Sequence, residues 1–250
     1  MTDEHEIELR PFPPFLPPNT TVLMMGSFPP AAEKRAMEFH YPNFQNDMWR
    51  VYGLVFFGDA MHFQRVGEKA FDAERIKAFL TERGIGSCPG VRRAIRTHGN
   101  AADAYLKVVE TVELPEILEK IPQCRRICTT GGKATEILLA LLETEVRAKE
   151  FKTGTTITAR CGDRDLLVTR LPSTSRAYPM KLEKKAEAYR KFFVEAGFAV
   201  AKYNMQMKWH DTDICQYRAI FNVCFRTDPW QGRWSARARD RRRRCRGRCL

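Results

Sequence analysis

The sequence predicts an α/β protein, a three-layer α/β/α sandwich with a central, mainly parallel four-stranded sheet. Four short apolar runs, at residues 20–26, 125–132, 155–162 and 165–173, have the length and composition of buried strands. Amphipathic segments with helical periodicity alternate with these runs. Strands that alternate with helices form mainly parallel sheets covered on both faces, and 250 residues are enough for one sizeable core.

The expected helices follow in order along the chain. Asn46 is placed to cap a helix over residues 47–58, and Gly84 is placed to end the next helix, over residues 72–84. Asn100 is the expected N-cap of a helix over residues 100–110. Two further helices are expected at residues 133–146 and 182–197. The buried stripe of the last one is expected to consist of Ala186, Tyr189, Phe193 and Val194.

Composition divides the chain into three parts. Residues 1–20 form a Pro-rich N-terminal strap, residues 21–205 a globular domain, and residues 206–250 a C-terminal extension that is basic and expected to be disordered from about residue 226. From Arg226 onward there are ten arginines against two aspartates, which is +8 of the total net charge of +12. The remaining +4 suits a domain that touches a few phosphates.

The cysteines and the N-terminus bear on cofactors and location. Eight cysteines with no CxxC pair and no export signal indicate free thiols rather than a disulfide framework or a metal site. The N-terminus "MTDEHEIELR" is too polar for a secretory signal, and no apolar run approaches the roughly 20 residues of a membrane span. We therefore expect no metal, no cofactor and no membrane association, and a location in a bacterial-type cytoplasm or a nucleus.

Two unusual loops leave predicted strands. "GSFPP", Gly26–Pro30, leads to "FHYPNFQNDMW" at residues 39–49, and "LPSTSRA" occupies residues 171–177. Ligands of such folds bind at the carboxyl ends of the strands, where both loops lie. The pair of motifs resembles the signature motifs of the uracil-DNA glycosylase superfamily, most closely the hypoxanthine/uracil-type (family 6) DNA glycosylases. The resemblance covers residues 20–197.

The first motif has residues suited to a flat polar base. Gly26 allows the backbone to approach a ligand, and the N–H groups of Ser27 and Phe28 can face a base carbonyl. By the resemblance, Tyr41 is the aromatic residue that stacks on the flipped base. The alternatives are a simple strand-to-helix turn for the loop and a core position for Tyr41, as is expected for Phe39, Phe44 and Trp49.

The resemblance also implicates Asn46 in catalysis. Its amide would hold the hydrolytic water or orient the base, and the alternative is that it only caps a helix. Leu171 stands where other branches of the superfamily carry a histidine, so stabilisation of the leaving base would depend on backbone N–H groups and Asn46. Gly86–Gly90 differs from the segment common in the family and is a candidate for setting the substrate range.

The second motif is rich in hydroxyl groups, which can bind the phosphates that flank a flipped nucleotide. Its alternative role is to cap the last helix. The expected DNA-binding residues are Pro172, Ser173, Thr174, Ser175 and Arg176.

The resemblance implies a monofunctional DNA glycosylase of base excision repair. It would hydrolyse the N-glycosidic bond of uracil or, second, hypoxanthine in single- or double-stranded DNA and leave an abasic site. It would act as a monomer, associated with the nucleoid and without a cofactor. A catalytically weak nucleic-acid-binding module with the same fold is the main alternative, because Pro30 and Arg176 depart from the family pattern and Leu171 replaces the histidine of other branches. A hydrolase that acts through Ser27 or Ser173 fits poorly, because no GxSxG motif is present.

Overall fold

A computed structural model describes residues 6–96 and 106–201 of the chain. Its main sheet has the strand order β3-β2-β6-β8-β7, and β7 is antiparallel to its neighbour. The strands are β2 (Val22–Gly26), β3 (Ile85–Pro89), β6 (Arg126–Thr129), β7 (Thr156–Cys161) and β8 (Arg164–Arg170). The predicted α/β class with a central, mainly parallel sheet is confirmed, but the sheet has five strands rather than four.

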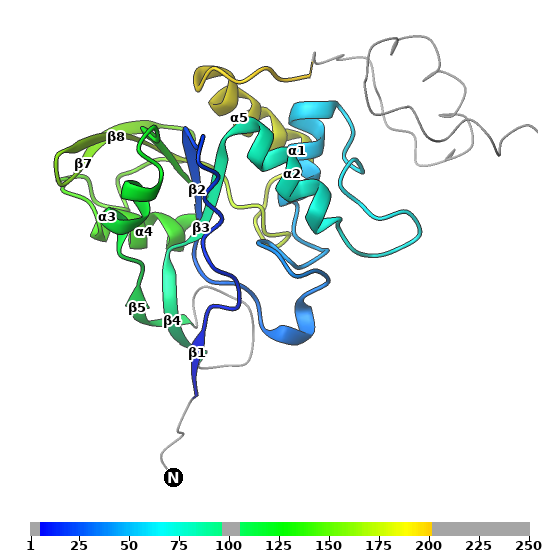
Figure 1. The fold of residues 1–250 in the computed structure, drawn as a ribbon, viewed down its shortest axis with the longest axis horizontal. Coiled ribbons are helices and arrows are strands. Elements are labelled where there is room, and N and C mark those ends of the chain that lie inside the picture. The colour runs from blue at the N-terminus through cyan, green and yellow to red at the C-terminus, as the bar shows by residue number, and fades with distance from the viewer. Residues whose placement is uncertain (1–5, 97–105, 202–250) are drawn as a thin grey trace, which may run out of the picture. The chain divides into compact units, whose positions relative to one another are not determined.

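The additional strand is β3, at one edge of the sheet (Figure 1). Its sequence, "IGSCP", contains glycine, serine and proline and lacks the apolar run typical of a buried strand. It is nevertheless fully buried, because the N-terminal segment covers its outer edge. There, Phe15 and Ser87 exchange two backbone hydrogen bonds of 2.8 Å.

Helices cover both faces of the main sheet (Figure 1). The helices α1 (Met48–Phe57), α2 (Ala73–Arg83) and α5 (Leu182–Glu195) lie on one face, and α3 (Leu114–Lys120) and α4 (Gly132–Ala140) lie on the other. Side chains of a strand alternate between the faces. Accordingly, Met24 of β2 packs with the first group of helices and Met25 with the second.

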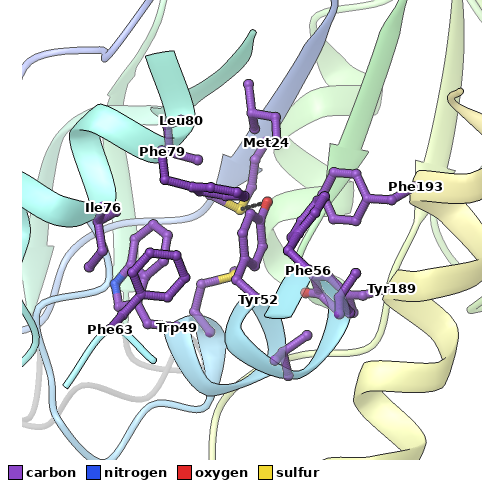
Figure 2. Packing of buried hydrophobic residues seen from close by; sticks show 14 of the residues in the cluster. Met24, Trp49, Tyr52, Phe56, Phe63, Ile76, Phe79, Leu80, Tyr189 and Phe193 are labelled. Atoms are coloured by element: carbon purple, nitrogen blue, oxygen red, sulfur yellow. Dashed lines mark hydrogen bonds between the residues drawn. The ribbon is translucent and has the colours of Figure 1, made fainter. Parts of the chain in front are cut away.

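The core under α1, α2 and α5 is largely aromatic (Figure 2). Tyr52 lies at its centre, fully buried, and its hydroxyl donates to the Met24 sulfur over 3.2 Å. Trp49 and Phe193 meet the Tyr52 ring edge-on at centroid distances of 5.5 and 5.3 Å. The predicted core positions of Phe39 and Trp49 are confirmed, and Phe44 packs against this core while partly exposed.

The last helix differs from its prediction at one position. Ala186, Tyr189 and Phe193 are buried as predicted, but Val194 is 54% exposed. Each residue advances about 100° around a helix, so Val194 points away from the stripe. The remaining buried positions are taken by Lys185 and Phe192.

A second, small sheet was not predicted. It has the order β1-β4-β5 and consists of β1 (Ile7–Leu9), β4 (Val91–Arg96) and β5 (Leu106–Thr111). The predicted helix over residues 100–110 is wrong from residue 106 onward, and its first part lies outside the described residues. Antiparallel pairing of β5 with β4, and the β-branched residues of "LKVVET", outweigh the helical pattern.

Several other expectations concern the ends of elements and the thiols. Gly84 ends α2 in a left-handed conformation, as predicted. Cys124 and Cys128 are buried free thiols. No helix of the described part is both long and apolar enough to cross a membrane. The predicted extension of residues 206–250 lies outside the described residues, and the predicted domain boundaries stay a prediction.

Candidate functional site

A cavity of about 330 Å³ lies at the carboxyl ends of β2, β3, β6 and β8. The short 3₁₀ helix η1 (Ala32–Lys34) lies in the connection between the two parts of the first motif. Both motifs contribute to the cavity wall. The predicted site residues that line it are Gly26, Ser27, Phe28, Tyr41, Asn46, Ser173, Thr174, Ser175 and Arg176. Pro172 does not line it, because Pro172 is buried behind the loop, where its carbonyl accepts a hydrogen bond of 3.1 Å from Tyr189.

The backbone of the first loop is held by the chain that follows β3. The N–H of Gly90 donates to the carbonyl of Gly26 over 2.8 Å, and the N–H of Val91 donates to the carbonyl of Ser27 over 3.2 Å. The Arg96 guanidinium donates to the Pro29 carbonyl and lies 5.2 Å from the centre of the Phe28 ring. The N–H of Phe28 has no acceptor within residues 6–96 and 106–201, so it is available to a ligand.

Tyr41 occupies the space beside Gly26. A Cβ atom added to Gly26 would lie 2.8 Å from the Tyr41 hydroxyl oxygen, so a larger residue at this position would force the Tyr41 side chain to shift. The same hydroxyl is 2.8 Å from Thr130 Oγ1 at the end of β6. Tyr41 has a φ of 52°, which lies in the left-handed region that residues other than glycine rarely adopt. The structure thus fixes the ring at the cavity wall by a hydroxyl contact and at some cost in backbone strain.

The N-cap of α1 is Asp47 and not Asn46 as predicted, but Asn46, one residue earlier, still makes a side-chain contact with the start of the helix. Its Oδ1 accepts a hydrogen bond of 2.9 Å from the N–H of Met48, in the first turn of α1. Its Nδ2 group has no acceptor in the described part of the chain. The side chain can therefore serve the helix with its oxygen and a ligand in the cavity with its amide N–H groups.

The second loop is tied to α1 and α5 by a buried ion pair that the sequence analysis missed. Lys185 Nζ, 1% exposed, donates to Asp47 Oδ2 and to the carbonyl of Ser175, both over 2.8 Å. The N–H of Asp47 donates to the carbonyl of Thr174 over 2.9 Å. One feature of the sequence could have indicated this ion pair. Lys185 lies four residues before Tyr189, which places a lysine on the apolar stripe of α5.

His40 is buried in the wall of the cavity beside β3. Its Nε2 lies 2.9 Å from the carbonyl oxygen of Pro13, and its Nδ1 lies 2.6 Å from Ser87 Oγ. Burial is the main cause that lowers the pKa of His40 to about 4; the hydrogen bond to the Pro13 carbonyl opposes this shift, and the nearby Arg10 adds to it. Because both ring nitrogens are engaged, His40 does not serve Ser27 or Ser173 as a base.

The cavity wall also includes Ser87, Cys88 and Pro89, from the Gly86–Gly90 segment considered for the substrate range, and Thr130, which the sequence analysis did not identify. Their strands lie next to β2 in the sheet. Among residues 6–96 and 106–201, no group of three or more His, Cys, Asp or Glu side chains is placed to hold a metal ion.

No protein-family model and no curated protein matches the sequence. Among solved structures, the fold is similar to that of a Methanosarcina acetivorans protein described provisionally as a uracil DNA glycosylase. The TM-score is 0.52 and the identity is 22%, over 77% of this chain and 100% of the other chain. At this identity the similarity shows a shared fold.

Proposed function

We propose that the protein is a monofunctional DNA glycosylase of the uracil-DNA glycosylase superfamily. It hydrolyses the N-glycosidic bond of a deaminated base, uracil first and hypoxanthine second, and leaves an abasic site for base excision repair. The observation that carries the proposal is the meeting of both motif loops at one cavity, with the amide of Asn46 and the ring of Tyr41 in its wall. The first motif ends at Trp49 and the second begins at Leu171, so 121 residues lie between them, and they share no other evident purpose.

The groups around the cavity suit this reaction. Cleavage leaves negative charge on the departing base, which preorganised N–H donors stabilise. The N–H of Phe28 and the Nδ2 group of Asn46 are such donors. Tyr41 supplies an aromatic face for the base, and stacking of this kind contributes about 1–3 kcal/mol.

Base release would occur without strand cleavage. Strand cleavage by these enzymes needs an amine that forms a Schiff base with the sugar. Lys185, which contacts the second loop, has its ammonium engaged by Asp47 and Ser175 and does not line the cavity.

The second loop supplies the contacts to DNA. Ser173, Thr174 and Ser175 carry hydroxyls, and Arg176 is an exposed cation beside the same cavity. Such groups bind the phosphates that flank a nucleotide turned out of the helix. The protein would act as a monomer on DNA in a bacterial-type nucleoid, and its motifs point to the hypoxanthine/uracil-type (family 6) branch.

Single-turnover incubation with labelled oligonucleotides tests the proposal. The substrates carry uracil, hypoxanthine or a G·T mismatch, in single and double strands, and alkali then cleaves any abasic site. We expect alkali-dependent cleavage at uracil, weaker cleavage at hypoxanthine, and no cleavage before alkali. Binding of these oligonucleotides without release of any base would contradict the proposal and favour a binding module. Cleavage before alkali would contradict the monofunctional mechanism.

A further inference from the structure

In the hydrogen bond between His40 and Ser87, the roles of donor and acceptor are fixed. A carbonyl oxygen only accepts hydrogen bonds, so the contact of His40 Nε2 with the Pro13 carbonyl places a proton on Nε2. A neutral imidazole has one N–H, so Nδ1 carries none. The Ser87 hydroxyl, 2.6 Å away, must then donate its proton to Nδ1.

The surroundings of His40 keep the ring neutral. The side chain is 2% exposed, Phe39 stacks on it at a centroid distance of 4.9 Å, and the charged group that acts on it is the cation Arg10. Both burial and a neighbouring cation disfavour imidazolium, so the pKa of His40 lies at about 4. At neutral pH the direction of the Ser87 hydroxyl is therefore constant.

Ser87 consequently meets a ligand only as an acceptor. A hydroxyl has one proton and two lone pairs, and the proton is already used. No other donor of the described residues reaches Ser87 Oγ. Ser87 lies in the cavity wall on β3, where its backbone is fixed by two hydrogen bonds to Phe15. The cavity wall thus includes a residue, 1% exposed, whose hydroxyl oxygen is a fixed acceptor and cannot turn into a donor.

We propose that Ser87, oriented by His40, is a specificity-determining residue that accepts a hydrogen bond from the ring N–H that deamination creates. This inference rests on the proposed function and names a residue that would recognise its substrates. Cytosine N3 and adenine N1 bear no hydrogen, whereas uracil N3 and hypoxanthine N1 each bear one. A group that only accepts hydrogen bonds can bind the ring N–H of either deaminated base. In cytosine or adenine it would instead meet the lone pair of the ring nitrogen, which is unfavourable. One contact therefore serves a pyrimidine and a purine alike.

The variant Ser87→Ala tests the role of the hydroxyl. We expect kcat/KM to fall about tenfold for uracil and hypoxanthine alike, which corresponds to one lost hydrogen bond. The preference for uracil over cytosine should fall with it, because a site that bonds a substrate N–H rejects analogues without it most strongly. Thr21→Ala, which removes an exposed hydroxyl at the opposite end of β2, is the matched control and should leave all rates unchanged.

The outcomes separate this inference from the proposed function. If the wild-type protein releases no base, the glycosylase proposal fails. If the wild-type protein releases uracil and Ser87→Ala releases it equally fast with unchanged preference, only the role of Ser87 is overturned. A fall for uracil with no fall for hypoxanthine would overturn the shared contact.

A measurement on the wild-type protein does not depend on the folding of a variant. The two isomers 1-methyluracil and 3-methyluracil have the same size, but only the first keeps the N3–H and carries its methyl group where the sugar was. We expect 1-methyluracil to inhibit uracil release at least about tenfold better than 3-methyluracil. Equal inhibition by the two isomers would overturn the proposal.

Discussion

The two loops at the cavity are held in different ways. The first loop is fixed by several hydrogen bonds to its backbone, which come from Gly90, Val91 and Arg96. The second loop is fixed chiefly by side chains of α5, with Lys185 bound to the Ser175 carbonyl and Tyr189 to the Pro172 carbonyl. The first loop is thus held through its backbone by the chain after β3. The second loop also accepts a backbone hydrogen bond from the N–H of Asp47, but its main side-chain supports are one buried cation and one hydroxyl.

Because the two loops are held differently, substitutions near them should have different effects on stability and on function. Bonds shared among many backbone groups tolerate the loss of any one of them. A buried ion pair does not, since removing one partner leaves the other charge buried and unpaired. Substitutions behind the second loop should therefore affect the fold most, and substitutions on the cavity side of the first loop should affect base release most.

The largest expected effect is that of Lys185→Met. Methionine fills a similar volume but leaves Asp47, whose side chain is 15% exposed, without its cation. Loss of one partner of a buried pair costs about 3–5 kcal/mol, so the free energy of unfolding in urea should fall by this amount. The matched control is Lys184→Met, since Lys184 pairs with Glu187 on the surface and its side chain is 70% exposed.

The double variant Lys185→Met/Asp47→Asn sharpens this test. With the carboxylate neutralised, most of the lost stability should return. An equal loss in the Lys184 and Lys185 variants would show that the second loop is not held by the buried pair.

The second effect concerns the pH dependence of stability, through His40. The pKa of His40 is about 4 in the folded protein and ordinarily 6.5, so the unfolded chain binds the additional proton first. The resulting stabilisation is complete above about pH 6.5 and is lost as the pH falls towards 4. Its size is on the order of 3 kcal/mol. The difference in unfolding free energy between wild type and His40→Gln should shrink by this amount between pH 7 and pH 4.

His62 is the comparison for this titration. Burial also lowers the pKa of His62 to about 4, but its ring lies on the loop after α1 and is only partly buried. His62→Gln should remove a smaller part of the pH dependence. A larger effect from His62 than from His40 would refute the assignment of the pH dependence to His40.

The third effect concerns catalysis by Asn46. Asn46→Asp keeps an oxygen for the N–H of Met48 but lacks the amide donor, and Asn46→Ala lacks both. Each variant should release uracil at least about a hundredfold more slowly while still binding uracil-containing DNA. Only the alanine variant should lose about 1 kcal/mol of stability, measured by thermal unfolding. Release by Asn46→Ala at nearly the wild-type rate would leave Asn46 as a helix contact alone.

The smallest effect is expected at Tyr41. Tyr41→Ala removes the stacking face and should slow base release by roughly tenfold or more. Tyr41→Phe keeps the ring and loses the hydroxyl contact with Thr130, so it should keep most of the activity and lose about 1 kcal/mol of stability. Equal losses of activity in the two variants would mean that the hydroxyl and not the ring matters.

The sequence was informative where residues act locally. The apolar run of β2, the left-handed Gly84 and the placement of both loops at strand ends could all be predicted from neighbouring residues. The strand β3 could not be, because what buries it is the distant segment around Phe15. Likewise, Lys185 reads as a surface residue until the fold brings Asp47 to it.

The central claim is that both loops hold one base and its flanking phosphates. A crystal structure of Asn46→Ala, which should bind without turnover, with a uracil-containing duplex tests it most directly. The account predicts that the uracil lies against Gly26–Phe28 and the Tyr41 ring, with phosphates at Ser173–Arg176. A base that stays stacked in the duplex, or phosphates bound at another face of the protein, would contradict it.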